Sequence, residues 1–306
     1  MIRWPGAPRP CVEPQTNPST VNGRRRSRKH GFKGDFGDPL TRKGKGVVRF
    51  LLWNTNGIGF TSSDRNLESL KMEKYKKLVQ MHSIDYTALT ELNTNWSKVD
   101  TEESIWAATA GWRRSRRLQV SYNKHYRTDT SRLIGGTASM AMDDLSYRIC
   151  AQANDSRDLG RWSHVTFKGK NNLKTTVITC YCPVYSTTSP GSAYSQQLVY
   201  MAQNKDILPD NCICPRQLFG YDLSELVNTL QNDNHQILLM GDFNSDYPKL
   251  VNWMHDHGLV DILHNRHGPC PRTCKRSQNS PIDCIFASPT IKCRKGRLPF
   301  LFQARQ

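Results

Sequence analysis

From Val47 onward, apolar segments of two kinds alternate along the chain. Short apolar runs bounded by polar residues or glycine indicate buried strands, whereas apolar residues at every third or fourth position indicate amphipathic helices. Strands and helices mixed along most of the chain are typical of a layered α/β or α+β domain. The pattern predicts strands over residues 47–53, 84–90, 118–122, 136–142, 162–168, 175–182, 236–240 and 282–287, and helices over residues 66–81, 193–201, 215–230 and 250–257.

The two ends of the chain lack this pattern. Residues 1–46 carry eleven Lys or Arg and three acids, a net charge of +8, and are rich in Gly and Pro. Such a composition predicts a disordered basic arm. Its basic run, residues 24–29, is typical of a nuclear-localisation or nucleic-acid-binding segment, although a solvated tail is an equal alternative. We therefore predict an arm over 1–46, a folded domain over 47–288 and a basic irregular tail over 289–306.

Apolar runs of about 18 residues are absent, so we expect neither a membrane-spanning helix nor a membrane partner. The chain also begins without the basic and apolar segments of a secretory signal, which predicts an intracellular protein. The ten cysteines are then expected as reduced thiols. Zinc is a weaker alternative, because among the close pairs only Cys270 and Cys274 have a spacing that suits it. Nothing in the sequence indicates an obligate protein partner.

The formal net charge of +17 indicates a polyanionic partner, nucleic acid before an anionic membrane surface. A second basic run follows Trp112 in the folded domain. Clustered cations beside an aromatic residue neutralise phosphates, so this run is a candidate nucleic-acid-binding segment, with a solvated basic turn as the alternative. Its cations are Arg113, Arg114, Arg116 and Arg117.

Polar side chains follow or end several of the predicted strands. Asn and Asp often end strands as turn formers, so a single case means little. Several in succession predict a convergent polar site on a rigid scaffold. Oxygen donors of this kind suit Mg²⁺ or Mn²⁺. Four strands carry such residues at their ends, namely Asn54, Asn56, Glu91, Tyr181, Asp242 and Asn244, and a fifth strand contains Asp283.

These positions lie in motifs that resemble those of the endonuclease/exonuclease/phosphatase superfamily, which includes DNase I-like nucleases, apurinic-type endonucleases and retrotransposon endonucleases. The resemblance covers residues 47–288. It implies an α+β fold, a four-layer α/β/β/α sandwich of two packed mixed sheets with outer helices. The motifs are Trp-Asn-Thr-Asn-Gly at 53–57, Thr-Glu at 90–91, Tyr-Cys-Pro at 181–183, Gly-Asp-Phe-Asn at 241–244 and Ile-Asp-Cys-Ile-Phe at 282–286.

The resemblance also implies a role for each residue. Glu91 would bind the divalent ion, Mg²⁺ or Mn²⁺, with assistance from Asn56. Asn54, Asn244 and Tyr181 would contact the scissile phosphate. Asp242 would orient or deprotonate the attacking water, and Asp283 would hold a catalytic histidine in the correct tautomer.

The sequence departs from the family pattern after Asp283. The family has a further strand with a histidine there, whereas no histidine follows Asp283 in this chain. The usual Gln-Glu pair is also Thr90-Glu91. We therefore expect a truncated or degenerate member that lacks the last strand. The nearby histidines are expected to be surface residues rather than substitutes; they are His255, His257, His264 and His267.

The leading functional hypothesis is a metal-dependent phosphodiesterase of the endonuclease type that acts on DNA, similar to the nicking endonucleases of retroelements. Two alternatives remain open. One is a non-catalytic remnant that binds nucleic acid through charge. The other is a phosphatase that acts on small or lipid phosphoesters.

Overall fold

The computed structural model describes residues 36–39, 41–58, 67–99, 104–186, 188–274 and 280–298. Each predicted strand and helix is present in it, with ends that lie within three residues of the prediction. The strands are β1 (Phe36–Gly37), β2 (Phe50–Asn54), β3 (Tyr86–Thr90), β4 (Arg116–Ser121), β5 (Thr137–Met142), β6 (Ile149–Asn154), β7 (Trp162–Lys168), β8 (Lys174–Tyr181), β9 (His235–Asp242), β10 (Val260–Asp261), β11 (Asp283–Ala287) and β12 (Arg297–Leu298). The α-helices are α1 (Leu67–Met81), α2 (Ile105–Ala108), α3 (Ala193–Gln203), α4 (Pro215–Asn232), α5 (Tyr247–Asp256) and α6 (Ile262–His267).

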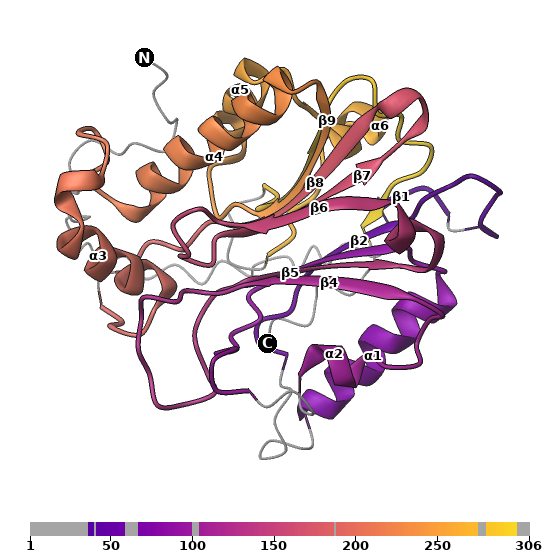
Figure 1. Cartoon of the computed structure of the whole chain (residues 1–306). Coiled ribbons are helices and arrows are strands. Elements are labelled where there is room, and N and C mark those ends of the chain that lie inside the picture. Colours follow the sequence, from indigo (N-terminus) through magenta and orange to yellow (C-terminus); the bar gives the residue numbers. More distant parts are fainter. Residues whose placement is uncertain are drawn as a thin grey trace, which may run out of the picture.

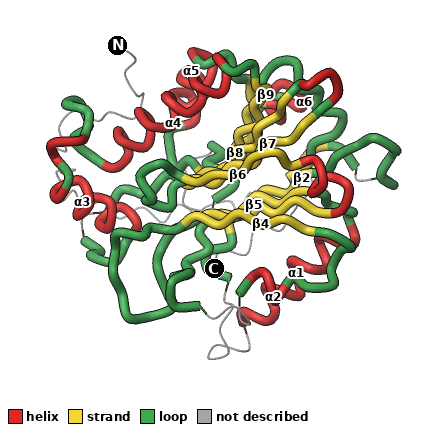
Figure 2. Tube along the Cα trace, viewed as in Figure 1, coloured by secondary structure: helices red, strands yellow, loops and turns green. Residues whose placement is uncertain are grey.

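Two sheets are stacked face to face between layers of helices (Figure 1; Figure 2). One has the order β2-β3-β5-β4, with β2 and β3 parallel and the other pairs antiparallel. The other has the order β10-β11-β9-β8-β7-β6, with β8 and β9 as its parallel pair. Helices α4 and α5 lie outside the six-stranded sheet, and α1 and α2 lie outside the four-stranded sheet (Figure 1). The predicted α+β, four-layer α/β/β/α sandwich is therefore confirmed.

The two sheets come from separate parts of the chain. Strands β2 to β5 are formed within residues 50–142, and strands β6 to β11 within residues 149–287. The chain passes from one sheet to the other through the 3₁₀ turn Asp143–Arg148. Each half of the sandwich therefore forms from a continuous segment.

Apolar side chains fill each of the spaces between the layers. Trp162, Phe219 and Trp253 belong to the cluster between the six-stranded sheet and its helices. Tyr75 and Trp112 belong to the cluster under α1. Burying a large side chain contributes about 1.5–3 kcal/mol, so these layers account for much of the folding free energy. The space between the sheets mixes apolar residues with hydroxyl groups that bond one another, namely those of Ser139, Ser163 and Thr179.

The structure corrects the predicted limits of the arm and the tail. Phe36 and Gly37 in β1 pair with Leu298 and Arg297 in β12, so part of each predicted irregular end is a small sheet. Asp38 adds a bidentate ion pair to the Arg266 side chain at 2.6 and 3.1 Å. The basic run at 24–29 and residues 299–306 lie outside the described residues, so the predicted missing last strand stays a prediction.

The sequence pattern also missed several short elements, namely α2, α6, β10 and strand β6. Strand β6 is at one edge of its sheet and contains partly buried and exposed residues, none of which is fully buried. Its sequence, Ile-Cys-Ala-Gln-Ala-Asn, has only one large aliphatic side chain, which explains why no apolar run marked it.

Among the described residues, no helix has both the length and the apolar character to span a bilayer.

Candidate active site at the facing strand ends

Asp242 is the last residue of β9 and is fully buried. Its neighbours in register are Tyr181 on the parallel strand β8 and Asp283 on the antiparallel strand β11. Directly paired residues project to the same side of a sheet, and neighbouring strands are about 4.8 Å apart. Three residues predicted from separate motifs therefore lie side by side in one row.

Asn54 connects this row to the other sheet. Its side-chain Nδ2 donates a hydrogen bond of 2.5 Å to Oδ2 of Asp242, from which it is separated by 188 residues along the chain. Its Oδ1 accepts a bond of 3.0 Å from the backbone N–H of Asn56. The amide is therefore oriented at both ends, and Asp242 faces the space between the sheets.

Glu91 and Asn56 extend from adjoining loops at the ends of β3 and β2. The backbone N–H of Gly57 and the hydroxyl of Thr55 both donate to the Glu91 carbonyl, at 2.7 and 2.9 Å. Lys71 of α1 donates to the carbonyls of residues 55, 56 and 57. Glu91 and Asn56 both adopt positive φ angles, 51° and 45°. Such conformations are costly for non-glycine residues and are often found at functional sites.

Asn244 lies just beyond β9, also with a positive φ of 47°. Its Nδ2 donates to the carbonyl of Cys182 at 3.0 Å, which joins the loops that follow β9 and β8. On the other side of the row, the hydroxyl of Thr273 accepts bonds of 3.1 Å from the backbone N–H groups of Ile282 and Asp283. The structure thus brings all seven predicted site residues to one end of the sandwich.

Gly241, which precedes Asp242, is opposite Cys180 in the neighbouring strand. A Cβ atom at this position would lie 2.3 Å from the Cys180 sulfur and 2.5 Å from its carbonyl oxygen. The glycine is therefore required for the close approach of β8 and β9, and hence for the pairing of Tyr181 with Asp242.

Comparison with known proteins rests on the structure. No family model matches the sequence, and no curated protein matches it. The human Nocturnin catalytic domain, solved with a bound sulfate anion, is similar over 83% of this chain and 86% of its own, at 15% identity and a TM-score of 0.52. An endonuclease/exonuclease/phosphatase family protein from Leptotrichia buccalis is similar over 80% of this chain and 89% of its own, at 14% identity and a TM-score of 0.50.

The chain has the endonuclease/exonuclease/phosphatase fold. A mannosyl-6-phosphatase from Bacteroides thetaiotaomicron shares it over 80% of this chain and 86% of its own, at 13% identity and a TM-score of 0.50.

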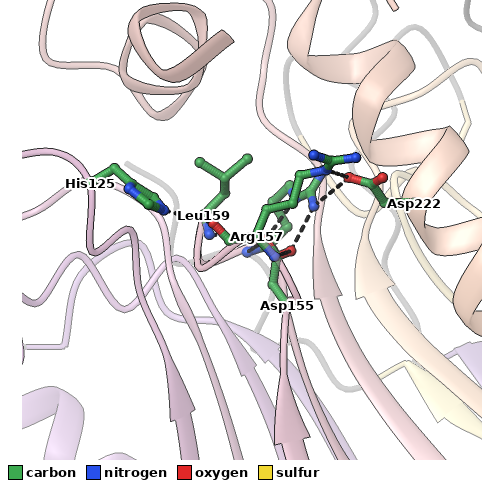
Figure 3. Close-up of polar contacts among 6 residues, drawn as sticks. His125, Asp155, Arg157, Leu159 and Asp222 are labelled. Atoms are coloured by element: carbon green, nitrogen blue, oxygen red, sulfur yellow. Dashed lines mark hydrogen bonds and ion pairs between the residues drawn. The ribbon is translucent and has the colours of Figure 1, made fainter. Parts of the chain in front are cut away.

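A buried ion-pair network supports the Tyr181 end of the site in this endonuclease/exonuclease/phosphatase fold. Arg161 is fully buried and forms bonds of 2.6 Å to each oxygen of Asp155 and one of 2.8 Å to Asp222 of α4. Arg157 also donates to Asp222, at 2.7 Å (Figure 3). Burial opposes the charge on Arg161, but the two carboxylates hold its pKa above the usual range. The carbonyl of Arg161 accepts the N–H of Tyr181 at 2.7 Å, so the network fixes the end of β8.

The predicted nucleic-acid-binding run stays a prediction, but the structure shows internal contacts for two of its cations. Arg113 donates to the carbonyls of residues 79 and 84, and Arg116 donates to Thr109 and to the carbonyl of residue 106. Both are engaged within the protein, and only Arg114 and Arg117 are exposed. Arg116 is also at the end of β4 that is far from the site. Ser121, at the other end of β4, pairs with Thr137, which in turn pairs with Thr90 beside Glu91. Charge in the sequence did not show that two of these side chains bond the protein's own carbonyl and hydroxyl groups.

The histidines near Asp283 in sequence are engaged elsewhere. His257 bonds Ser224 at 3.0 Å, in the layer between α4 and α5. The ring centroids of His264 and Tyr247 are 6.2 Å apart, and Tyr247 packs against the core on the helix side of the six-stranded sheet. His267 bonds the carbonyl of residue 296 at 2.9 Å, and His255 is exposed in the last turn of α5. Since Asp242 and Asp283 face the other sheet, none of these four histidines substitutes at the site.

The donor atoms at the site suit a hard divalent cation. Glu91 and Asn56 supply carboxylate and amide oxygens, the ligands that Mg²⁺ and Mn²⁺ prefer. The part of the chain that the structure describes contains no group of three or more His, Cys, Asp or Glu residues with metal-site geometry. That finding is compatible with Mg²⁺, because this ion commonly binds through one or two carboxylates and keeps several waters. The residues present therefore fit the predicted ion.

Proposed function

We propose that this protein is a divalent-metal-dependent phosphodiester hydrolase that acts as an endonuclease on DNA, similar to retroelement endonucleases. The observation that supports this proposal best is the hydrogen bond between Asn54 and Asp242. This bond joins two motifs from different sheets beside Tyr181 and Asp283. Hydrolysis of a phosphodiester would require such a convergence of polar groups around the phosphate. The fold and the net charge of +17 are consistent with it.

Asp242 acts on the attacking water in this mechanism. The Asn54 amide fixes one carboxylate oxygen, so that the carboxylate can orient the water and accept its proton. An amide nitrogen carries two hydrogens, so Asn244 retains a donor for a phosphate oxygen beyond its bond to Cys182. The Tyr181 hydroxyl contacts the same phosphate. Donors that are fixed before reaction stabilise the charge that develops on the phosphate.

A bound Mg²⁺ or Mn²⁺ held by Glu91 and Asn56 would neutralise phosphate charge and lower the pKa of water. The two ligands are oriented by the protein itself. The contacts of Thr55, Gly57 and Lys71 hold their loops in a conformation that an unconstrained chain would seldom adopt.

Plasmid nicking tests the proposal. The full chain is expected to nick supercoiled DNA with Mg²⁺ or Mn²⁺ and to stop when EDTA is added. Glu91→Ala and Asp242→Asn should each lower the nicking rate by about 100-fold or more. Arg148→Ala, at an exposed cation just before β6 and at the end of the sheet away from Tyr181, should leave it unchanged. Equal nicking by the wild type and Glu91→Ala would contradict the proposal.

A phosphatase that acts on small phosphoesters is the second candidate. It is favoured by the similarity to the mannosyl-6-phosphatase and by the internal contacts of Arg113 and Arg116, which remove two cations from the expected DNA-binding surface. Hydrolysis of p-nitrophenyl phosphate or mannose 6-phosphate without DNA nicking would support it. DNA binding that falls steeply with salt, without hydrolysis of either substrate, would instead support a non-catalytic remnant.

A further inference from the structure

Arg216 of α4 contacts two loops of the candidate site at once. Its Nη1 donates to the Pro183 carbonyl, and its Nη2 donates to the Ser245 hydroxyl, each at 2.7 Å. Pro183 is two residues beyond Tyr181, and Ser245 follows Asn244 directly. A single partly buried guanidinium therefore bridges the ends of β8 and β9.

These contacts close a ring of bonds around Asn244. The Asn244 amide donates to the Cys182 carbonyl, and the Ser245 hydroxyl donates to the Phe243 carbonyl at 2.9 Å. Arg216 then links Ser245 back to Pro183, the neighbour of Cys182. The guanidinium presents its donors in a rigid plane, so the ring fixes both a distance and an orientation. This explains how Asn244 is held at a positive φ.

The position of Arg216 in its helix supports a role that depends on these contacts. It is the second residue of α4, where the positive end of the helix dipole disfavours a cation by about 0.3–1 kcal/mol. The N-cap residue, Cys214, makes no side-chain capping bond that would offset this cost. The hydrogen bonds of Arg216 to the two site loops offset this cost.

We propose that Arg216 is a positioning residue that sets Asn244 and Tyr181 at the correct separation around the reacting phosphate. This inference rests on the proposed phosphoester hydrolysis. Misplacement of a contacting group by about 1 Å can lower a rate by about 100-fold. Loss of the two guanidinium hydrogen bonds, to Pro183 and Ser245, should therefore reduce kcat rather than substrate affinity.

The test compares Arg216→Lys, Ser245→Ala and the double variant with Arg148→Lys as a matched control at an exposed site remote from the strand ends. Lysine keeps the charge but has no planar fork. We expect Arg216→Lys to lower kcat about 10- to 100-fold with KM within about twofold. The double variant should be no slower than Arg216→Lys, because Ser245 acts through the arginine. Arg148→Lys should match the wild type. Ser245→Ala keeps the test decisive if Arg216→Lys does not fold.

Amide hydrogen exchange of segments 181–186 and 243–247 provides a readout that is independent of activity. We expect both segments to exchange faster in Arg216→Lys and Ser245→Ala, with the control unchanged. If the wild type hydrolyses no phosphoester but exchange responds in this way, the proposed function fails and the bridging role stands. Unchanged exchange and unchanged kcat would overturn the positioning role, as would a rise in KM alone, which would instead assign Arg216 to substrate binding.

Discussion

The two halves of the candidate site are built in different ways. On the four-stranded sheet, Asn56 and Glu91 lie in tight loops that are held by backbone carbonyls and by Lys71. On the six-stranded sheet, Asp242 lies in a row of three paired strands above a buried ion-pair network. The half proposed to bind the metal is therefore held through its backbone, whereas the half proposed for acid–base chemistry depends on long-range side-chain pairing.

The largest effect is expected where the halves meet. Asp242→Asn retains the size of the side chain but removes the carboxylate that accepts a proton, so the nicking rate should fall about 10²- to 10⁴-fold. Asn54→Ala, which removes the partner instead, should have a smaller effect. Single-turnover nicking measures both rates. If Asp242→Asn is as active as the wild type, the assignment of the base to the six-stranded half is wrong.

The buried network gives the next largest effect, on stability rather than rate. Arg161→Met leaves Asp155 and Asp222 as buried carboxylates that lack their main partner, which should cost about 3–5 kcal/mol of unfolding free energy. Urea unfolding followed by circular dichroism measures this cost. Arg132→Met, at an exposed cation, is the control. A loss below 1 kcal/mol would show that the buried ion-pair network does not stabilise the six-stranded half.

Protonation should destabilise the six-stranded half further. Burial, with a smaller contribution from His235, lowers the pKa of His164 on β7 to about 4. The folded state therefore binds fewer protons than the unfolded state, whose histidine titrates near 6.5, and stability is lost as the pH falls from about 6.5 to about 4. We expect a loss of about 2 kcal/mol by pH 4.5. Thermal melts at pH 7 and 4.5 should show a smaller pH effect in His164→Gln than in the wild type.

The four-stranded half should respond more mildly to loss of its helix contact. Lys71→Met removes three hydrogen bonds to the carbonyls of residues 55–57, which should cost about 1–3 kcal/mol. It should also raise the Mg²⁺ concentration needed for half-maximal nicking, because Asn56 is in the loop that it holds. Lys76→Met on the exposed side of α1 is the control. An unchanged Mg²⁺ dependence would separate Lys71 from the metal-binding half.

The sequence predicted the elements whose side chains are buried on a regular period. Strand β7 has its predicted bounds, and α4 begins at its predicted proline. The candidate site residues could be named because each lies within two residues of the end or the start of such a strand, in a recognisable motif. Whether these residues act as assigned remains for the variants above to decide.

Lys71, Arg216 and Thr273 escaped detection for a physical reason. Each bonds backbone or hydroxyl groups outside its own element, and Arg216 reaches partners 33 and 29 residues away. Such contacts between distant residues leave no periodic pattern in the sequence by which they could be recognised. Arg113 and Arg116 illustrate the converse, since a run of positive charge indicated a surface but did not reveal which cations fold back onto carbonyl groups.

The passage from one sheet to the other within residues 143–148 has a practical consequence. A chain divided in this turn yields two fragments, one with Asn54, Asn56 and Glu91, the other with Tyr181, Asp242, Asn244 and Asp283. Neither fragment contains a complete site. Phosphoester cleavage would then serve as a complementation signal that reports when the two sheets have reassembled.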